Sequence, residues 1–297
     1  MNTRLLSLGL LALLLLLAGG CRTHDPCEDC WEPPAPTGVW TITGDEYVEI
    51  VWDELYIHDL DHYRIYRSDS EFGDYWHIGS SDDTYFIDDD VSNGYTYYYA
   101  ITAVDWNGYE SDLSYATIHD TPRPAGYDLR VWDYDDEAGV DFSGFYHHMV
   151  QPWDDLYTDM YLFWDEEDDS YAFASTEGND LQYAGWADHL DELDWAPQYG
   201  WSIGQTDVVN LHEGQTYWVW TWDNHFAKFR VTEIGDDYVF IDWAYQESVG
   251  NPELNLIPLG DRTESRSKPM RQEDWQIFTP QGRNSRADTY DTVAGRR

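Results

Sequence analysis

Between about residues 39 and 247, hydrophobic side chains alternate with polar ones in short runs, and helical periodicity is nearly absent. In "EYVEIVWDE", for example, Val48, Ile50 and Trp52 occupy alternate positions, so all three face one side of an extended strand. Turn residues such as Gly, Asn and Asp separate the runs. The pattern predicts an all-β chain built from two consecutive antiparallel β domains.

Pro-rich segments mark the boundaries of these domains. "WEPPAPTG", at 31–38, is typical of a stiff spacer, and "HDTPRPAG", at 119–126, lies where one domain would join the next. We therefore expect a linker over 22–36, a first β domain over 37–120 and a second over 124–258. The only helical candidate is the short segment "ADHLDELDW", at 187–195.

The first domain resembles the fibronectin type III family over residues 33–118. The resemblance is carried by Pro36 and Val39, by Trp52 and by the segments "YRIYRS" and "FIDDDVSNGYTYYYAITAVDWNGYESDLS". It implies an Ig-like sandwich of about seven strands. It also implies that Trp52 is the central core tryptophan and that the hydroxyl of Tyr97 bonds back to upstream backbone. In "HYRIYRS", Tyr63 and Ile65 alternate onto one face, so we expect a structural role for Tyr63 as well.

The type III family consists of spacer and recognition modules rather than enzymes, and the chain lacks the Arg-Gly-Asp triplet of the integrin-binding subset. The second domain resembles only uncharacterised modules that accompany type III domains in bacterial lipoproteins, a similarity that implies no activity. Its clearest part is "GQTYWVWTWDNHFAKFRVTEIGDDYVFIDWAYQ", at 214–246, which two turns divide into three antiparallel strands.

Lys228 and Arg230 stand in the middle of this aromatic run. With a two-residue first turn, alternation predicts a core face that holds Trp218, Trp220, Trp222, Ala227, Phe229 and Val231. A three-residue second turn, at Gly235–Asp237, adds Ile241, Trp243 and Tyr245 to that face. Lys228 and Arg230 then lie on the opposite face beside Phe226, with Asp242 across from Arg230.

Two interpretations of Lys228, Arg230, Phe226 and Asp242 remain open. The two bases are either counter-charges that stabilise a sheet inside a negative molecule, with their alkyl stems covering Phe226, or part of a binding face for an acidic ligand or a sugar. The first interpretation predicts that replacing both bases by Gln lowers stability and leaves ligand binding unchanged.

The net charge of the chain limits the partners that it can bind. The chain has 58 acidic and 16 basic side chains, a formal net charge of −42. Such a field opposes binding to nucleic acid. It suits either a saline medium or binding of Ca²⁺, the only cofactor we consider. The acidic segments 133–139 and 164–170 lack the ligand spacing of a calcium loop, and no metal site is assigned. The 24 Tyr, 16 Trp and 10 Phe exclude a disordered chain.

The N-terminus predicts export and membrane attachment. Residues 1–21 join a cationic start to an apolar run and small residues, as in a secretory signal. The end of this segment, "LAGGC", resembles the lipobox of bacterial lipoproteins, although Ala18 stands where Leu is usual. The resemblance implies that Cys21 carries the lipid anchor. Cys27 and Cys30 then remain as a candidate disulfide. The tail, 261–297, leans basic and is predicted to be disordered.

No recognisable catalytic motif or histidine metal spacing is present, and no catalytic residue is assigned. The sequence therefore favours a non-catalytic lipoprotein of the cell envelope, at the outer membrane or cell surface, that binds a glycan or an envelope protein. The alternatives are an extracellular hydrolase of polysaccharides, or an accessory module of one, and an acidic Ca²⁺-binding coat protein.

Overall fold

The computed structural model describes residues 32–114, 118–202 and 205–254. In these ranges nearly all regular structure is antiparallel β, which confirms the predicted fold class. Within the same ranges, no helix is long and apolar enough to cross a membrane. The expected signal (1–21), Cys21, the Cys27–Cys30 pair and the tail (261–297) lie outside the described residues.

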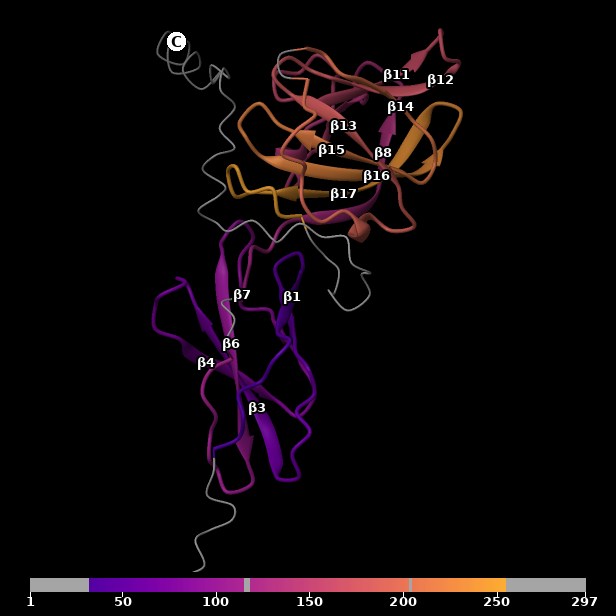
Figure 1. Cartoon of the computed structure of the whole chain (residues 1–297). Helices are drawn as coiled ribbons and strands as arrows, with labels where there is room; N and C mark the ends of the chain where they lie inside the picture. Colours follow the sequence, from indigo (N-terminus) through magenta and orange to yellow (C-terminus); the bar gives the residue numbers. More distant parts are fainter. Residues whose placement is uncertain (1–31, 115–117, 203–204, 255–297) are drawn as a thin grey trace, which may run out of the picture.

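The N-terminal unit is a sandwich of a three-stranded sheet, ordered β1-β2-β5, and a four-stranded sheet, ordered β4-β3-β6-β7 (Figure 1). This arrangement is a fibronectin type III fold, as the sequence resemblance implies. Its strands are β1 (Trp40–Thr43), β2 (Val48–Val51), β3 (Leu60–Ser68), β4 (Trp76–Ser81), β5 (Tyr85–Asp88), β6 (Tyr97–Asp105) and β7 (Ile118–Asp120).

Aromatic residues hold this unit together. Trp52 is 3% exposed and packs edge-on against Tyr63, with ring centroids 5.2 Å apart. The hydroxyl of Tyr63 accepts a hydrogen bond from the backbone N–H of Leu55 at 3.0 Å. The hydroxyl of Tyr97 accepts one from the backbone N–H of Ser92 at 3.1 Å. Each tyrosine therefore ties a loop to a strand through its polar tip while its ring packs below.

The C-terminal unit contains two five-stranded antiparallel sheets, ordered β10-β9-β11-β12-β14 and β13-β15-β16-β17-β8. The strands are β8 (Ala125–Trp132), β9 (Gly139–Val140), β10 (Val150–Gln151), β11 (Met160–Asp165), β12 (Ser170–Ser175), β13 (Asp180–Trp186), β14 (Val208–Asn210), β15 (Gln215–Trp220), β16 (Phe226–Ile234) and β17 (Tyr238–Gln246). Two short 3₁₀ turns, η1 (Phe142–Gly144) and η2 (Leu190–Glu192), complete it.

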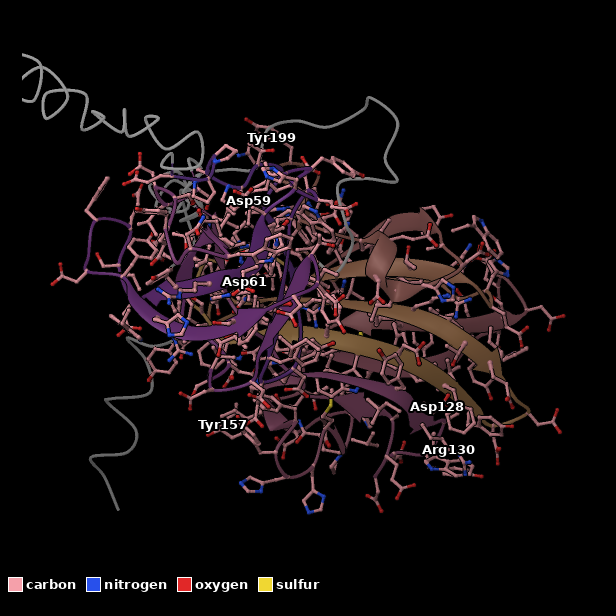
Figure 2. All side chains as sticks on the ribbon, turned by 90° about the horizontal axis from the view of Figure 1, so that it is seen from below. Asp59, Asp61, Asp128, Arg130, Tyr157 and Tyr199 are labelled. Atoms are coloured by element: carbon pink, nitrogen blue, oxygen red, sulfur yellow. The ribbon has the colours of Figure 1, made fainter. Side chains whose placement is uncertain are left out.

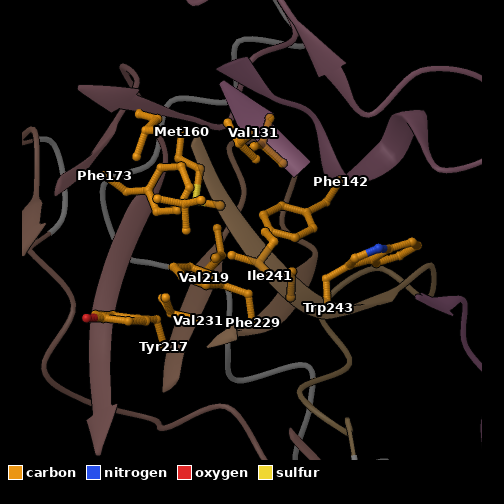
Figure 3. Close-up of a cluster of buried hydrophobic side chains, with 14 of the residues drawn as sticks. Val131, Phe142, Met160, Phe173, Tyr217, Val219, Phe229, Val231, Ile241 and Trp243 are labelled. Atoms are coloured by element: carbon orange, nitrogen blue, oxygen red, sulfur yellow. The ribbon is translucent and has the colours of Figure 1, made fainter. Parts of the chain in front are cut away.

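The core of this unit forms where the inward faces of the two sheets meet (Figure 3). Phe173 meets Phe229 edge-on at 5.4 Å, and Tyr217 stacks on Phe229 at 4.8 Å. The cluster continues along β17 through Ile241 and Trp243. Because each large side chain fully removed from water stabilises the fold by about 1.5 to 3 kcal/mol, this cluster is the main source of cohesion in the unit.

The turn between β15 and β16 makes the predicted register of that hairpin wrong. The N–H of Thr221 bonds to the carbonyl of His225 at 2.9 Å, so three residues, 222–224, form the loop. Asn224, at φ 70°, takes the left-handed conformation that ends such loops. Trp220 therefore pairs with Phe226 and Trp218 with Lys228. One extra loop residue moves Trp218 and Trp220 to the face opposite Phe229.

The predicted three-residue turn between β16 and β17 is wrong, because Ile234 pairs with Val239 and the loop is one residue longer. A bulge between Val231 and Glu233 absorbs the extra residue, so the predicted pairing is recovered beyond it. Arg230 stands opposite Asp242, and Phe229 stands opposite Trp243. Ile241, Trp243 and Tyr245 consequently belong to the core cluster, as the sequence pattern indicates.

Residues 187–201, here called the covering segment, pack on the outer face of the second sheet. The expected helix at 187–195 is reduced to the single turn η2. Leu190 and Leu193 of this segment form a second apolar cluster with Trp218, Trp220 and Phe226. Part of the outer face of the sheet is thereby removed from solvent.

The two units meet at a buried joint that contains charged groups. The N–H of Gly94 bonds to Pro122 O at 2.8 Å, and the N–H of Arg123 bonds to Gly44 O at 3.0 Å. The fully buried Arg123 also donates from Nη2 to Leu254 O at 3.1 Å. Thr43 donates to the carboxyl of Asp120 at 2.6 Å. Burial raises the pKa of Asp120 to about 6, although the hydrogen bond from Thr43 opposes the shift.

We expect Asp120 to make the stability of the protein depend on pH. Folded Asp120 keeps its proton to higher pH than the unfolded chain, whose pKa is near 3.8. Its contribution to stability is therefore complete below about pH 4 and is lost as the pH rises to about 6. Asp120→Asn, which cannot ionise, should remove up to about 3 kcal/mol of this loss between pH 4 and 7 in denaturant titrations. Asp89→Asn, at an exposed acid of the same unit, serves as the control, and an unchanged pH slope in Asp120→Asn would contradict the assignment.

Candidate functional site

The structure removes Lys228 and Phe226 from the surface. Both are 0% exposed, beneath the covering segment. Lys228 Nζ donates to the backbone carbonyl of Leu193 at 2.8 Å. Burial lowers the pKa of Lys228 well below its ordinary value, and the nearby guanidinium of Arg123 adds to the shift. A ligand in solvent therefore has no access to the ammonium group or to the ring.

Arg230 and Asp242 are also tied to this covered region. Arg230 Nε donates to Ala187 O at 2.8 Å, and Asp242 faces Arg230 across the strands. Burial raises the pKa of Asp242, a shift that the charge of Arg230 opposes. Lys228, Arg230, Phe226 and Asp242 lie on neighbouring strands, but Lys228 and Phe226 are buried and Arg230 is half-buried. Of the two interpretations, a binding face that includes Lys228 and Phe226 is contradicted by their burial, and both bases instead donate to backbone carbonyls of the covering segment.

A group of buried carboxyls lies elsewhere in the C-terminal unit. Burial raises the pKa of Asp159 well above its ordinary value, and the neighbouring carboxylate of Asp141 adds to the shift. Burial also acts on Asp223, but hydrogen bonds and charge from His225 outweigh it, and the pKa of Asp223 is lowered. Asp159 is 3% exposed and accepts from Phe142 N–H at 2.9 Å. Asp141 and Asp159 are thus part of the interior, whereas the side chain of Asp223 is 31% exposed. In the described residues, no group of three or more His, Cys, Asp or Glu is arranged to hold a metal.

An open hollow of about 330 Å³ lies on the outer side of the first sheet of this unit. We call it the aromatic hollow. Its walls come from the loop 152–158, from β11 and from the end of β12 and the turn after it. The lining residues are Trp153, Asp154, Asp155, Leu156, Tyr161, Ser175, Thr176, Glu177 and Thr206.

Strand alternation places the ring of Tyr161 in the hollow and the ring of Phe163 beside it. Met160 and Leu162 point into the core, so Tyr161 and Phe163 face outward. Their ring centroids are 5.9 Å apart, and Trp153 lies 5.5 Å from Tyr161 on the other side. Trp153 is 43% exposed. The three rings form an aromatic row on the outer surface of the sheet.

A glycine allows the loop 152–158 to lie directly on the sheet. Gly139 stands beside Tyr161 in the pairing of β9 with β11. A Cβ atom at Gly139 would come within 2.6 Å of Pro152 O and 2.7 Å of Thr158 Oγ1. Any larger residue would push the loop outward, and Trp153 with it.

Internal hydrogen bonds hold the same loop in shape. The N–H of Tyr157 donates to Asp155 Oδ1 at 3.0 Å, and Thr158 Oγ1 donates to Pro152 O at 3.0 Å. A residue outside the loop also holds it, because the backbone N–H of Trp153 donates to Asp135 O at 3.1 Å. The backbone that carries the Trp153 ring is therefore held in place by the protein itself, which reduces the ordering cost of binding.

The polar wall of the hollow consists of acceptors. Asp154, Asp155 and Glu177 bring carboxylates to it, and Thr176 brings a hydroxyl that donates to Thr158 O and accepts from Asn179 at 2.8 Å. Carboxylates accept hydrogen bonds and repel anions. Flat rings combined with fixed acceptors suit a neutral ligand that has apolar faces and several hydroxyl groups.

Sequence reasoning missed this site. The alternation in "MYLFWD" (160–165) would have placed Tyr161 and Phe163 on one face, and the apolar Met160 and Leu162 on the other. The contribution of Trp153 had no comparable signal, because it depends on a loop folding back along the strand that follows it and on a backbone bond to Asp135.

No protein-family model matches the chain. It is similar to an amylopullulanase of Thermoanaerobacterium saccharolyticum, with 30% identity over 49% of the chain and 11% of the relative. It is also similar to an amylopullulanase of Thermoanaerobacterium thermosulfurigenes, with 31% identity over 49% of the chain and 7% of the relative. The matched part thus spans about a tenth or less of these relatives.

Solved structures are similar to part of the chain. A Fn3-like protein from Clostridium thermocellum has 27% identity and a TM-score of 0.27 over 30% of this chain and 92% of that one. A β-1,2-glucanase from Parabacteroides distasonis has 28% identity and a TM-score of 0.28 over 31% of this chain and 13% of that one.

We expect Lys228 to act on stability rather than on ligand binding. Lys228→Ala would leave a cavity and deprive the buried Leu193 carbonyl of its donor, a loss of about 2 to 4 kcal/mol in the free energy of unfolding. Lys228→Met keeps most of the side-chain volume and should lose less. Equal unfolding free energies for Lys228→Ala and the wild type, measured by urea denaturation, would contradict the buried position.

Proposed function

We propose that this protein is a non-catalytic accessory module that binds neutral α-glucan polysaccharides in the aromatic hollow. The observation that carries the proposal is the fixed pair of rings, Trp153 and Tyr161, 5.5 Å apart beside the carboxylates of Asp154 and Asp155. The rings would stack against the apolar faces of sugar rings, and the carboxylates would accept hydrogen bonds from sugar hydroxyls.

The comparisons support the choice of glucan. The name amylopullulanase denotes enzymes that act on amylose-like glucans and pullulan, and the similar region is a small part of each enzyme. A segment that makes up so small a share of each enzyme is typical of an accessory module that assists a separate catalytic region. It favours an accessory role for this chain over the hydrolase alternative.

The charge of the protein supports a neutral ligand. With a net charge of −42, the molecule repels acidic polysaccharides at long range, and the carboxylates of the hollow repel them locally. A neutral glucan meets no such barrier.

We further propose that the protein works at the cell envelope, as the N-terminal sequence suggests. Cys21 would hold the lipid anchor, and the fibronectin type III unit would separate the glucan-binding unit from the membrane. Two or more acyl chains on Cys21 would suffice for durable attachment.

Loss of the exposed indole should weaken binding strongly. We expect Trp153→Ala to lower the affinity for soluble amylopectin or pullulan by about tenfold or more, because central aromatic side chains dominate most binding sites. Trp164→Ala is the matched control. Trp164 lies on β11, the strand that carries Tyr161, is 44% exposed, and is outside the hollow. Affinity gel electrophoresis measures both variants. The proposal fails if no neutral glucan retards the wild type, or if the Trp164 variant is impaired as strongly.

The anchor can be tested separately. In a bacterial host supplied with labelled palmitate, we expect the full chain to incorporate the label and Cys21→Ala to lose it, because only the Cys21 thiol would be acylated. Cys27→Ala should incorporate the label normally. Label that persists in Cys21→Ala would contradict lipidation at this residue.

A further inference from the structure

The part of the second sheet that the covering segment leaves open carries an arginine packed on aromatic rings. The guanidinium of Arg130, on β8, lies 5.0 Å from the ring of Trp132, 5.2 Å from Tyr238 and 4.6 Å from Phe240. Arg130 itself is exposed and projects from the ribbon (Figure 2). The rings hold the guanidinium in one orientation through cation–π contact.

Arg130 differs from the other bases of the described ranges. Arg64 and Arg67 form ion pairs with carboxylates, whereas Arg123, Lys228 and Arg230 donate to backbone carbonyls. Among the residues that the structure describes, the guanidinium of Arg130 contacts rings and no carboxylate or carbonyl pairs with it, so its N–H groups are available to a ligand.

A short turn connects this cluster with the aromatic hollow. Tyr134 stacks on Trp132, with centroids 5.6 Å apart and planes at 18°, and it is 49% exposed. The next residue, Asp135, accepts the hydrogen bond from Trp153 N–H at 3.1 Å. The turn that follows β8 therefore contacts the loop that forms one wall of the hollow.

The topology supports this continuity. β8 is an edge strand of its sheet, and the turn after Trp132 leads into β9, whose neighbour β10 is an edge strand of the other sheet and directly precedes the loop 152–158. In Figure 2, Arg130 and Tyr157, which belongs to the loop 152–158, both project from the same lower side of the molecule.

The hollow alone is too small for a polymer. Its volume of about 330 Å³ is at the lower end of the range for small-molecule sites, roughly 300 to 1,000 Å³. Only one or two sugar rings can occupy it, so a longer chain must continue over the neighbouring surface.

We propose that one extended binding surface runs from the aromatic hollow across Tyr134 to Arg130, and that its ligand is a glucan chain of several units rather than a short oligosaccharide. This inference rests on the proposed function of the hollow. Tyr134 provides an open ring face midway along the surface. Arg130 provides hydrogen-bond donors at its far end, which complement the acceptors of the hollow.

The surroundings of Arg130 favour hydroxyl groups over an anion. The hydroxyl of Tyr238 donates to Glu233 at 2.6 Å, and the hydroxyl of Tyr134 donates to Asp237. Asp128 is on the same strand, two residues from Arg130. These carboxylates would repel an acidic ligand, while a sugar hydroxyl can accept from the guanidinium without that penalty.

The test compares short and long ligands on the full chain by isothermal titration calorimetry with maltotriose and with a malto-oligosaccharide of about ten units. We expect the wild type to bind the longer ligand more tightly. Tyr134→Ala and Arg130→Ala should each weaken binding of the longer ligand about threefold to tenfold and leave maltotriose binding unchanged within about twofold. Tyr134→Phe should keep the wild-type affinity. Tyr85→Ala, at a tyrosine that is 47% exposed in the N-terminal unit, is the matched control.

The outcomes separate this inference from the proposed function. If both ligands bind the wild type equally, or if Tyr134→Ala and Arg130→Ala bind the longer ligand normally, the extended surface is refuted while the hollow remains as a short site. If neither ligand binds the wild type, the proposed function itself fails, and the extended surface fails with it.

Discussion

The loop 222–224 determines which side chains of β15 and β16 enter the core of the C-terminal unit. Side chains along a strand alternate between two faces, so the number of loop residues sets which face of one strand continues as which face of the next. Three residues place Tyr217 and Val219 on the same side as Phe229, where they meet Phe173 of the other sheet. Two residues would bring the bulky Trp218 and Trp220 into that core and would turn Tyr217 outward.

The same constraint explains the buried bases. Once Phe229 faces inward, Lys228 must face the other side, where Trp218, Trp220 and Phe226 already form an apolar surface. The covering segment removes that surface from water, and Lys228 and Arg230 supply donors to its backbone carbonyls. Two bases that appear from sequence to offer a ligand surface instead satisfy a segment that has almost no helical or sheet hydrogen bonds of its own.

In the part of the chain that the structure describes, no segment covers the aromatic hollow on the outer face of the first sheet. Because Met160 and Leu162 are needed for the core, the alternate positions Tyr161 and Phe163 are necessarily outside, and Gly139 lets the loop carrying Trp153 settle beside them. The carboxylates around these rings match the net charge of the whole chain, so the local chemistry and the long-range field both favour a neutral ligand. Alternate residues of β11 therefore supply the core on one face of the sheet and the candidate site on the other.

Local chemistry determined the fold class, since strand alternation and turn residues are properties of neighbouring positions. The same alternation assigned Ile241 and Trp243 to the interior without any knowledge of contacts, whereas the core role of Trp52 was implied by the resemblance to fibronectin type III domains. The register of the β15–β16 hairpin depends on the left-handed backbone conformation of Asn224. The sequence alone is compatible with more than one turn type at this place. The burial of Lys228 and the position of Trp153 needed more still. Lys228 bonds to Leu193, 35 residues away, and Trp153 bonds to Asp135, 18 residues away. Such contacts form only when the sheets and loops pack against each other.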